Sequence, residues 1–292
     1  MVSGIPGNSQ RLKYHNIRSS LADGLCFYSH NQGITLKTPT EYIPGAARYP
    51  RILVYHEISR TFHLGINNVS PRDFHAHLDF LQKAQLSILP LRGFSERNPD
   101  NSIALTFDDG YDSFYDQVFP TLIERQIPAT LFIITDFAGK RNSWDVTFGI
   151  NRRDHLSWEQ IQEIAASGIS IGSHTSTHRH LTLLDAETAK LEIVDSKKMI
   201  EDQIGTEVTA LALPYGSAST DIFIVARKAG YQEICGGVPG YYGPVGGILP
   251  RLPVYRGDNA KTLRRKLDWR VPEIARLKAL QSCSQLTRLI QK

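Results

Sequence analysis

The sequence predicts an α/β fold built around a parallel β-sheet, either open or closed into a barrel. Short apolar runs alternate with segments of helical periodicity from about residue 51 to residue 235. The chain has 292 residues, enough for one large α/β domain or two small ones, and its hydrophobic share of 41% is ordinary for a globular protein. In such folds the chemistry gathers at the carboxyl ends of the strands.

The first two elements set the pattern. Residues 51–56 are apolar and β-branched, as expected of a buried strand. Ser70 and Pro71 then supply an N-cap and a proline at the first helical position, and the apolar residues of Phe74–Leu81 recur at helical spacing. We therefore predict a helix over 71–85.

Later elements follow by the same criteria. Ser157 and Gln160 have the spacing of a capping box that opens a helix ending at about residue 167. A long helix over 186–203 has apolar positions at Leu191, Val194 and Ile200. The remaining predicted elements are strands over 102–107, 129–134, 169–172, 208–213 and 231–235, helices over 113–125 and 221–228, and a helical tail from residue 261 that breaks at Pro272.

Composition excludes several classes of function. The formal net charge is +4 and the basic residues are scattered among acidic ones, so we expect no nucleic-acid partner. The three cysteines, Cys26, Cys235 and Cys283, lie far apart, which argues against a zinc ribbon or a disulfide framework. The first residues lack an apolar leader and no long apolar run occurs, so we expect no transmembrane segment and a cytoplasmic location.

Two adjacent carboxylates follow the predicted strand 102–107. Asp108 and Asp109 can share one site only if the strand ends there, and Gly110 permits the turn. Two carboxylates forced together are costly unless a cation neutralises them. The alternative is a solvated Asp-Asp-Gly turn.

A pair of histidines follows the predicted strand 169–172. His174 and His178 stand at positions i and i+4, so they can face one metal ion if the segment is a helical turn. Two imidazoles and one carboxylate, with water completing the shell, form the ligand set of a hydrolytic zinc-type site. His180, next to this pair, has a structural or exposed role as its simplest interpretation.

A third element, Pro214-Tyr215-Gly216, follows the predicted strand 208–213. It is either an ordinary proline-glycine turn or a turn that aims a backbone N–H at an oxyanion and lays a tyrosine against a sugar ring.

Together, Thr106-Phe107-Asp108-Asp109-Gly110, His174-Thr175-Ser176-Thr177-His178 and Pro214-Tyr215-Gly216 resemble the motifs of the polysaccharide deacetylases, the carbohydrate esterases with a NodB homology domain. The resemblance covers residues 50 to about 256. It implies a distorted (β/α)7 barrel over 49–258, between an irregular N-terminal extension (1–48) and a C-terminal helical tail (259–292).

The resemblance also implies roles for individual residues. Asp108 is the expected catalytic base, and Asp109, His174 and His178 are the expected ligands of one divalent metal ion. Zinc is our first choice for the metal, with cobalt, nickel or iron as alternatives. Tyr215 N–H, in the turn that begins at Pro214, is the expected oxyanion donor. The family often acts outside the cytoplasm, which conflicts with the location expected from the missing leader.

The chain departs from the common family pattern in two places. The arginine usually found two residues before the proline of the third motif is replaced by Ala212, and no histidine follows His180 to act as general acid. In both departures the chain resembles the poly-N-acetylglucosamine deacetylase subgroup, whose members lack this arginine and have the acid histidine after an early strand. His56 matches that position, with a structural strand-end histidine as the alternative. Arg251 is a candidate to replace the missing arginine and hold Asp108 ionised.

These features predict a metal-dependent hydrolase that removes N-acetyl groups from an amino-sugar glycan. An O-acetyl esterase or a linear-amide hydrolase on the same fold is one alternative. A carbohydrate-binding homologue that has lost catalysis is another. The sequence does not identify the glycan or the oligomeric state.

Overall fold

A curled parallel sheet forms the centre of the molecule. The computed structural model describes residues 49–61, 66–94, 101–143, 153–238 and 246–284. A nine-stranded sheet has the order β10-β9-β8-β7-β6-β5-β1-β11, and β4 pairs with β5 off this path. All of these pairings are parallel. Since β10 and β11 stand at opposite ends of the order and are separated only by Pro250 and Arg251, the sheet must curl until its ends meet.

The strands of this sheet are short and almost entirely buried. They are β1 (Ile52–Tyr55), β4 (Ser87–Ile88), β5 (Ser102–Phe107), β6 (Thr130–Ile133), β7 (Ser170–Ser173), β8 (Ala210–Ala212), β9 (Glu233–Cys235), β10 (Ile248–Leu249) and β11 (Leu252–Pro253). A separate two-stranded sheet pairs β2 (Glu57–Ile58) with β3 (Asn68–Val69). The result is the distorted (β/α)7 barrel that the sequence motifs predicted.

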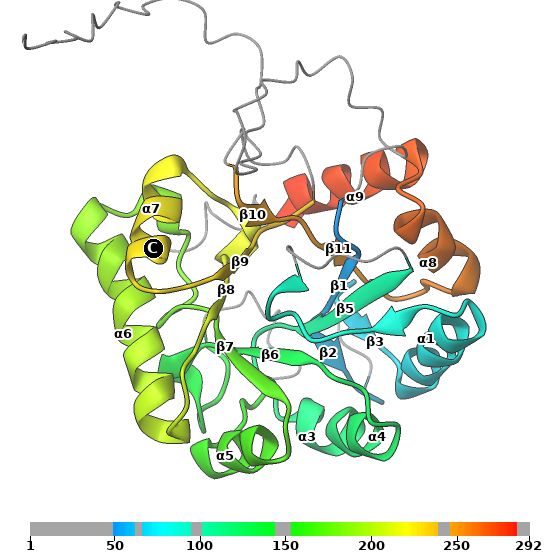
Figure 1. The fold of residues 1–292 in the computed structure, drawn as a ribbon, viewed down its shortest axis with the longest axis horizontal. Helices are drawn as coiled ribbons and strands as arrows, with labels where there is room; N and C mark the ends of the chain where they lie inside the picture. The colour runs from blue at the N-terminus through cyan, green and yellow to red at the C-terminus, as the bar shows by residue number, and fades with distance from the viewer. Residues whose placement is uncertain (1–48, 62–65, 95–100, 144–152, 239–245, 285–292) are drawn as a thin grey trace, which may run out of the picture.

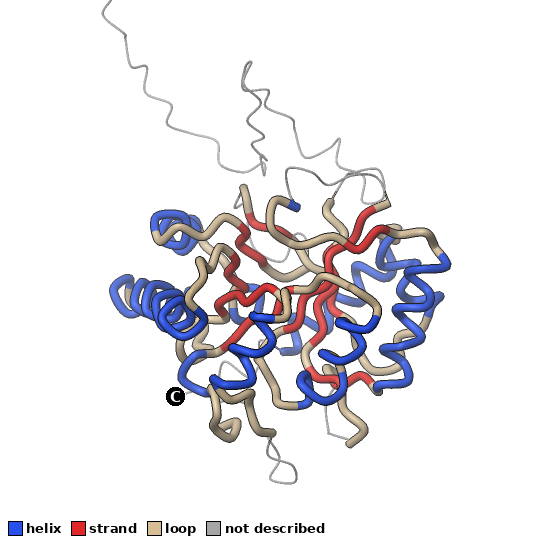
Figure 2. The backbone as a smooth tube through the Cα atoms, turned by 60° about the horizontal axis from the view of Figure 1, so that its bottom comes forward, coloured by secondary structure: helices blue, strands red, loops and turns tan. Residues whose placement is uncertain are grey.

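Helices surround the strands (Figures 1 and 2). They are α1 (Pro71–Lys83), α3 (Ser113–Gln117), α4 (Phe119–Glu124), α5 (Trp158–Ala166), α6 (Ala186–Ile204), α7 (Thr220–Lys228), α8 (Ala260–Leu267) and α9 (Val271–Ser284), with 3-10 turns at η2 (Thr135–Phe137), η3 (Leu181–Leu183) and η4 (Pro214–Gly216). The capping box of Ser157 and Gln160 is present at the start of α5, as predicted. Within the described ranges, none of the helices has the length and apolar character that a membrane crossing requires.

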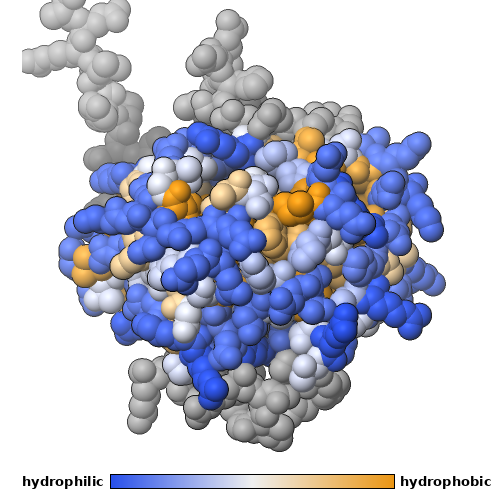
Figure 3. All heavy atoms as spheres, turned by 90° about the horizontal axis from the view of Figure 1, so that it is seen from below, coloured by the Kyte–Doolittle hydropathy of each residue, from blue (hydrophilic) through white to orange (hydrophobic). Residues whose placement is uncertain are grey.

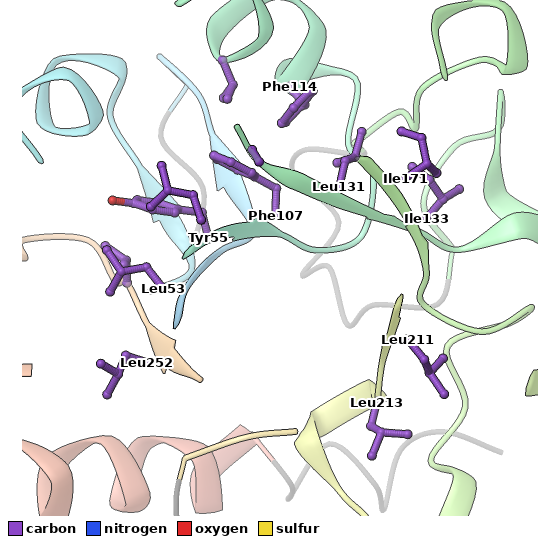
Figure 4. Close-up of a cluster of buried hydrophobic side chains, with 14 of the residues drawn as sticks. Leu53, Tyr55, Phe107, Phe114, Leu131, Ile133, Ile171, Leu211, Leu213 and Leu252 are labelled. Carbon is purple, nitrogen blue, oxygen red and sulfur yellow. The ribbon is translucent and has the colours of Figure 1, made fainter. Parts of the chain in front are cut away.

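Alternation along the strands divides the apolar residues between two faces of the sheet. Leu131 and Ile133 of β6 belong to the large core cluster under the helices, whereas Phe132 belongs to a smaller cluster. Figure 4 shows side chains of the large cluster, among them Phe107 pointing toward Phe114 of α3, whose ring centroid lies 5.1 Å away. The second cluster mixes large residues such as Phe132 with small ones such as Ala212, as expected of the narrow interior of a barrel.

Two sequence predictions about helices were wrong. The single helix expected over 113–125 is broken at Val118, because Pro120 has no N–H with which to continue the helical hydrogen bonds. The break in the tail falls before Val271 rather than at Pro272, which lies in the first turn of α9, where proline is tolerated.

The helix predicted over 186–203 is present as α6, and its inner face carries a charged residue. Of the apolar positions noted in the sequence, Ile200 is buried, whereas Leu191 is 47% and Val194 37% exposed. Glu192 and Ile193 are buried on the inner face. A hydrophobic pattern assigns a charged residue such as Glu192 to solvent, so this burial needs a partner that the pattern does not show.

The C-terminal helices pack into the main core. Leu263 and Leu267 of α8 and Ile274 and Leu277 of α9 all belong to the large core cluster.

The N-terminal extension over 1–48 and Leu289 lie outside the described residues. The face seen in Figure 3 is mostly hydrophilic, with small separate hydrophobic areas.

Candidate metal centre and active site

The end of β5 brings two carboxylates to one site. Asp108 N–H donates to Tyr55 O at 2.9 Å and thereby continues the pairing of β5 with β1. Asp109 and Gly110 then both take left-handed conformations, with φ of 72° and 66°. The turn that the sequence analysis attributed to Gly110 therefore begins one residue earlier, at Asp109, and aspartate tolerates this region better than most residues.

The two predicted histidine ligands follow β7 in an irregular turn. His174 and His178 are both buried, and their ring centroids are 4.7 Å apart. The segment between them is not the helical turn that the i, i+4 spacing suggested, because Thr175 and His178 have positive φ values of 69° and 59°. His174 Nδ1 donates to the carbonyl oxygen of Ala212 at 2.8 Å, so its Nε2 is directed toward the carboxylates.

Asp109, His174 and His178 fit a divalent metal ion. Among the described residues these three offer ligand atoms that all lie within 4.8 Å of one another. Asp109 Oδ1 is 3.4 Å from His174 Nε2 and 3.7 Å from His178 Nε2. Ligands about 2.0–2.2 Å from a tetrahedral zinc ion stand about 3.3–3.6 Å apart, so the spacing suits such an ion. A buried carboxylate oxygen facing two imidazole nitrogens is also a donor set that a cation stabilises.

The surroundings shift the pKa values of His174 and His178 in opposite directions. Burial opposes the charged form of both rings, but the carboxylates of Asp108 and Asp109 raise the pKa of His174 above its ordinary value. Burial and the charge on His174 lower the pKa of His178 to about 3. A metal ion requires neutral imidazoles, so binding would replace the positive charge of His174 with that of the ion.

Asp108 is held by Arg251 in a two-pronged ion pair. Arg251 Nη1 and Nη2 donate to the two carboxylate oxygens of Asp108, each at 2.7 Å, and both side chains are almost fully buried. Burial alone would raise the pKa of Asp108, but the guanidinium outweighs it and holds the pKa below its usual range. Arg251 Nη1 also reaches Thr106 Oγ1 at 3.3 Å. The structure thus places Arg251 where the sequence analysis sought a replacement for the missing arginine.

His56 lies beside the same carboxylates. It follows β1 directly, is half-buried, and lies within electrostatic range of both Asp108 and Asp109. Its Nδ1 is buried and has no hydrogen-bond partner in the part of the chain that the structure describes. A structural hydrogen bond from that nitrogen, the alternative role considered for His56, is thus not observed among these residues.

The turn of Pro214 and Tyr215 closes another side of the site. Tyr215 has φ 58° and ψ 9°, a conformation that costs a non-glycine residue about 1–3 kcal/mol. Its ring lies edge-on to His178 at 4.9 Å and stacks on His180 at 5.4 Å. His180 is therefore a buried residue packed against the site and not a solvent-exposed one.

Two further residues support the ligands and were missed from the sequence. Glu192 of α6 accepts hydrogen bonds from the backbone N–H groups of Ser176 (3.0 Å) and Thr177 (2.9 Å), and from the Thr177 hydroxyl, so it anchors the turn between the histidines. His155 Nδ1 donates to Asp109 O at 2.8 Å. At helical spacing, Glu192 lies beside the buried residues Ala189, Ile193, Ser196 and Ile200 of α6, and this spacing is the signal that could have placed it on the inner face. We find no comparable signal in the sequence for His155.

Comparisons with known proteins agree on a family. The family model described as polysaccharide deacetylase matches residues 95–234. Bacillus subtilis YxkH, whose name assigns it to the polysaccharide deacetylases, is 32% identical over 187 residues, which are 62% of this chain and 62% of that protein. A poly-beta-1,6-N-acetyl-D-glucosamine N-deacetylase of Staphylococcus aureus is 26% identical over 179 residues, 56% of this chain and 59% of that protein. The chain thus spans about three fifths of the length of these curated relatives.

Solved structures share the fold. IcaB from Ammonifex degensii superposes with a TM-score of 0.62 at 22% identity and covers 76% of this chain and 96% of its own. The Streptococcus pyogenes deacetylase PplD, in complex with acetate, gives a TM-score of 0.62 at 21% identity and covers 75% of this chain and 97% of its own. At these identities the likeness concerns the fold.

Proposed function

We propose that the chain is a polysaccharide deacetylase that hydrolyses N-acetyl groups on an amino-sugar glycan and depends on one divalent metal ion. The family model that matches residues 95–234 and the 32% identity to YxkH support this proposal. The observation that carries the proposal is a buried set of three ligand atoms directly beside a second carboxylate that is paired with arginine. The first group suits a metal, and the second stays available as a base.

Asp109, His174 and His178 would hold the ion, for which zinc is our first choice and cobalt, nickel or iron are alternatives. When bound, the ion supplies Lewis-acid polarisation of the acetyl carbonyl and of the attacking water. Three protein ligands suit a catalytic site, because structural zinc sites are normally closed by four.

Asp108 is the proposed general base. Arg251 donates a hydrogen bond to each of its oxygens and favours the ionised form that a base requires. His174 Nε2 lies 3.8 Å from Asp108 Oδ2, so the base and the metal ligands surround the same small volume. Water held there is within reach of the carboxylate that would remove its proton.

His56 is the proposed general acid, and the turn of Pro214 and Tyr215 is the proposed oxyanion element. An amine leaves poorly unless it is protonated, so amide hydrolysis needs a proton donor as well as a base. His56 lies near both aspartates and has an unpartnered Nδ1 among the described residues. The backbone N–H of Tyr215 would donate to the oxygen that becomes negative in the transition state.

The proposed substrate is an N-acetylated amino-sugar polymer. This choice rests on the S. aureus relative, which is named for activity on poly-β-1,6-N-acetylglucosamine. An O-acetyl ester of a xylan-like polymer or a linear amide would use the same metal and base, and a homologue that only binds glycans would use neither.

Acetate release tests the proposal. The chain is stripped with a chelator, reloaded with zinc or cobalt, and incubated with β-1,6-linked N-acetylglucosamine oligomers, acetylated xylan and a small linear amide. We expect acetate from the oligomers only after reloading, and at least a 100-fold loss in Asp108→Asn. The matched control, Asp202→Asn on the exposed side of α6, should keep full activity. Acetate from xylan alone would favour the esterase, and one bound metal ion without any hydrolysis would favour the binding protein.

A further inference from the structure

The backbone of the Tyr215 turn has a conformation that needs external support. Tyr215 and Gly216 both have positive φ values, 58° and 63°. Gly216 N–H donates to Leu213 O at 2.9 Å, which closes the turn locally. A tyrosine in this region persists only where its surroundings hold it in place, and such strain concentrates at functional sites.

Support comes from the C-terminal helix. The side chain of Gln281, on α9, is buried and uses both ends of its carboxamide. Its Nε2 donates to Tyr215 O at 3.1 Å, and its Oε1 accepts from Val238 N–H at 2.9 Å. One amide group thus joins the Tyr215 turn to the backbone that follows β9, from a helix 66 residues further along the chain than Tyr215.

Two glycines leave the space that this carboxamide occupies. A Cβ atom at Gly237 would lie 1.9 Å from Gln281 Nε2, and one at Gly216 would lie 2.6 Å from the same atom. Both distances are shorter than real Cβ contacts, so a side chain at either glycine would require the carboxamide to move. The observed position of Gln281 against the turn therefore depends on glycine at 216 and at 237.

The same backbone segment carries the arginine that holds the base. Gly237 N–H donates to Gly216 O at 3.3 Å, and Arg251 N–H donates to Gly237 O at 3.1 Å. Arg251 Nε donates to Gly236 O at 3.3 Å. Through this segment, Gln281 is connected to the proposed oxyanion donor and to the partner of Asp108.

We propose that Gln281 is a positioning residue for the oxyanion turn and that α9, outside the region matched by the family model, is part of the working active site. The inference rests on the proposed function, in which Tyr215 N–H stabilises the transition state. Positioning groups around an active site hold donors to within fractions of an ångström, and misplacement by about 1 Å can cost about 100-fold in rate.

The test uses Gln281→Glu and Gln281→Leu in the full chain. Glutamate keeps the shape and the acceptor for Val238 N–H but cannot donate to Tyr215 O, and leucine removes both bonds. We expect kcat to fall by about 10-fold or more with KM within about twofold and metal content unchanged, because the lost interaction acts on the transition state. Hydrogen exchange of the peptide over 211–218 should become faster, while exchange over 102–107 stays the same.

Gln162→Glu is the matched control, because this exposed carboxamide of α5 donates to a backbone carbonyl, Gln203 O, at 2.8 Å, and Gln203 is not a residue of the site. Unchanged kcat and unchanged exchange over 211–218 in both Gln281 variants would overturn the positioning role. If the unmodified, metal-loaded chain releases no acetate, the proposed function fails, and the catalytic part of this inference fails with it. Exchange over 211–218 then tests only whether Gln281 holds the Tyr215 turn in place: faster exchange supports that, and unchanged exchange overturns it.

Discussion

Replacing Arg251 with methionine should destabilise the protein and abolish most of its activity. Both nitrogens of the guanidinium end bond Asp108 at 2.7 Å, and the two side chains are only 4% and 3% exposed. Opposite charges about 4 Å apart interact by about 4 kcal/mol at an effective dielectric constant of about 20. Removing one partner of such a buried pair typically costs about 3–5 kcal/mol, because the other charge stays behind.

We therefore expect Arg251→Met to lower the free energy of unfolding by about 3–5 kcal/mol. The hydrogen bonds of Arg251 to Thr106 Oγ1 and Gly236 O are lost as well. Because Asp108 without its partner no longer favours the ionised form, kcat should fall by about 100-fold or more. Asp108→Asn should destabilise the protein by a comparable amount, since it leaves the arginine unpaired.

A double-mutant cycle isolates the interaction. In the variant that carries both Arg251→Met and Asp108→Asn, neither charge remains buried, so its cost should be about 2–4 kcal/mol less than the sum of the single costs. Urea unfolding followed by circular dichroism, on metal-free and zinc-loaded protein, measures each corner. The control is Arg264→Met in the exposed pair with Asp268, which should cost less than about 1 kcal/mol. Costs that add to within about 0.5 kcal/mol would refute the reasoning.

Three further outcomes are expected. His56→Ala should bind metal normally and lose about 100-fold or more in kcat, as metal analysis with steady-state kinetics will measure. Glu192→Gln should weaken zinc affinity by about 10-fold or more, measured by competition with a chromophoric chelator, because an amide cannot accept all three hydrogen bonds of the ligand turn. His77 is buried, which lowers its pKa below the ordinary 6.5, so the unfolded chain binds a proton that the folded chain does not. Its contribution to the free energy of unfolding is present above pH 6.5 and is lost as the pH falls toward the lowered pKa, by up to about 1.4 kcal/mol per pH unit. Urea unfolding measured across this pH range should therefore show a flatter dependence of stability on pH in His77→Gln.

Each of these has a result that contradicts it. Unchanged turnover in His56→Ala would remove that residue from the mechanism. Glu192→Gln is paired with Glu187→Gln on the exposed surface of the same helix, and equal zinc affinity in the two variants would reduce Glu192 to an ordinary core residue. A pH profile of stability that is the same with and without His77 would assign the acid sensitivity to other groups.

Much of the site could be anticipated because its signals are local. Three pairs of site residues each follow a short buried strand: Asp108 and Asp109, His174 and His178, and Pro214 and Tyr215. The carboxyl ends of parallel strands meet at one edge of the sheet. Asp109, His174 and His178 do come together in the structure, and His56 follows β1, the strand that pairs with β5. Short motifs at strand ends thus indicate both which side chains form the site and where in the fold they lie.

Other features depend on contacts that no local pattern encodes. Arg251 meets Asp108 across 143 residues, and only because β11 pairs with β1. Buried Glu192 of α6 accepts its hydrogen bonds from a turn 15 and 16 residues away.

By itself, then, the sequence determined the fold class and the side chains that gather at the candidate metal centre, because strand and helix periodicity and the residues at strand ends are properties of short segments. Tertiary structure alone decided which carboxylate anchors the histidine turn and that Gln281 reaches Tyr215 from α9. It also brought Arg251, which the sequence offered only as a candidate, onto both carboxylate oxygens of Asp108. The physical reason is that a buried polar group must be satisfied by whatever partner the packed chain brings to it, and that partner can lie anywhere along the sequence.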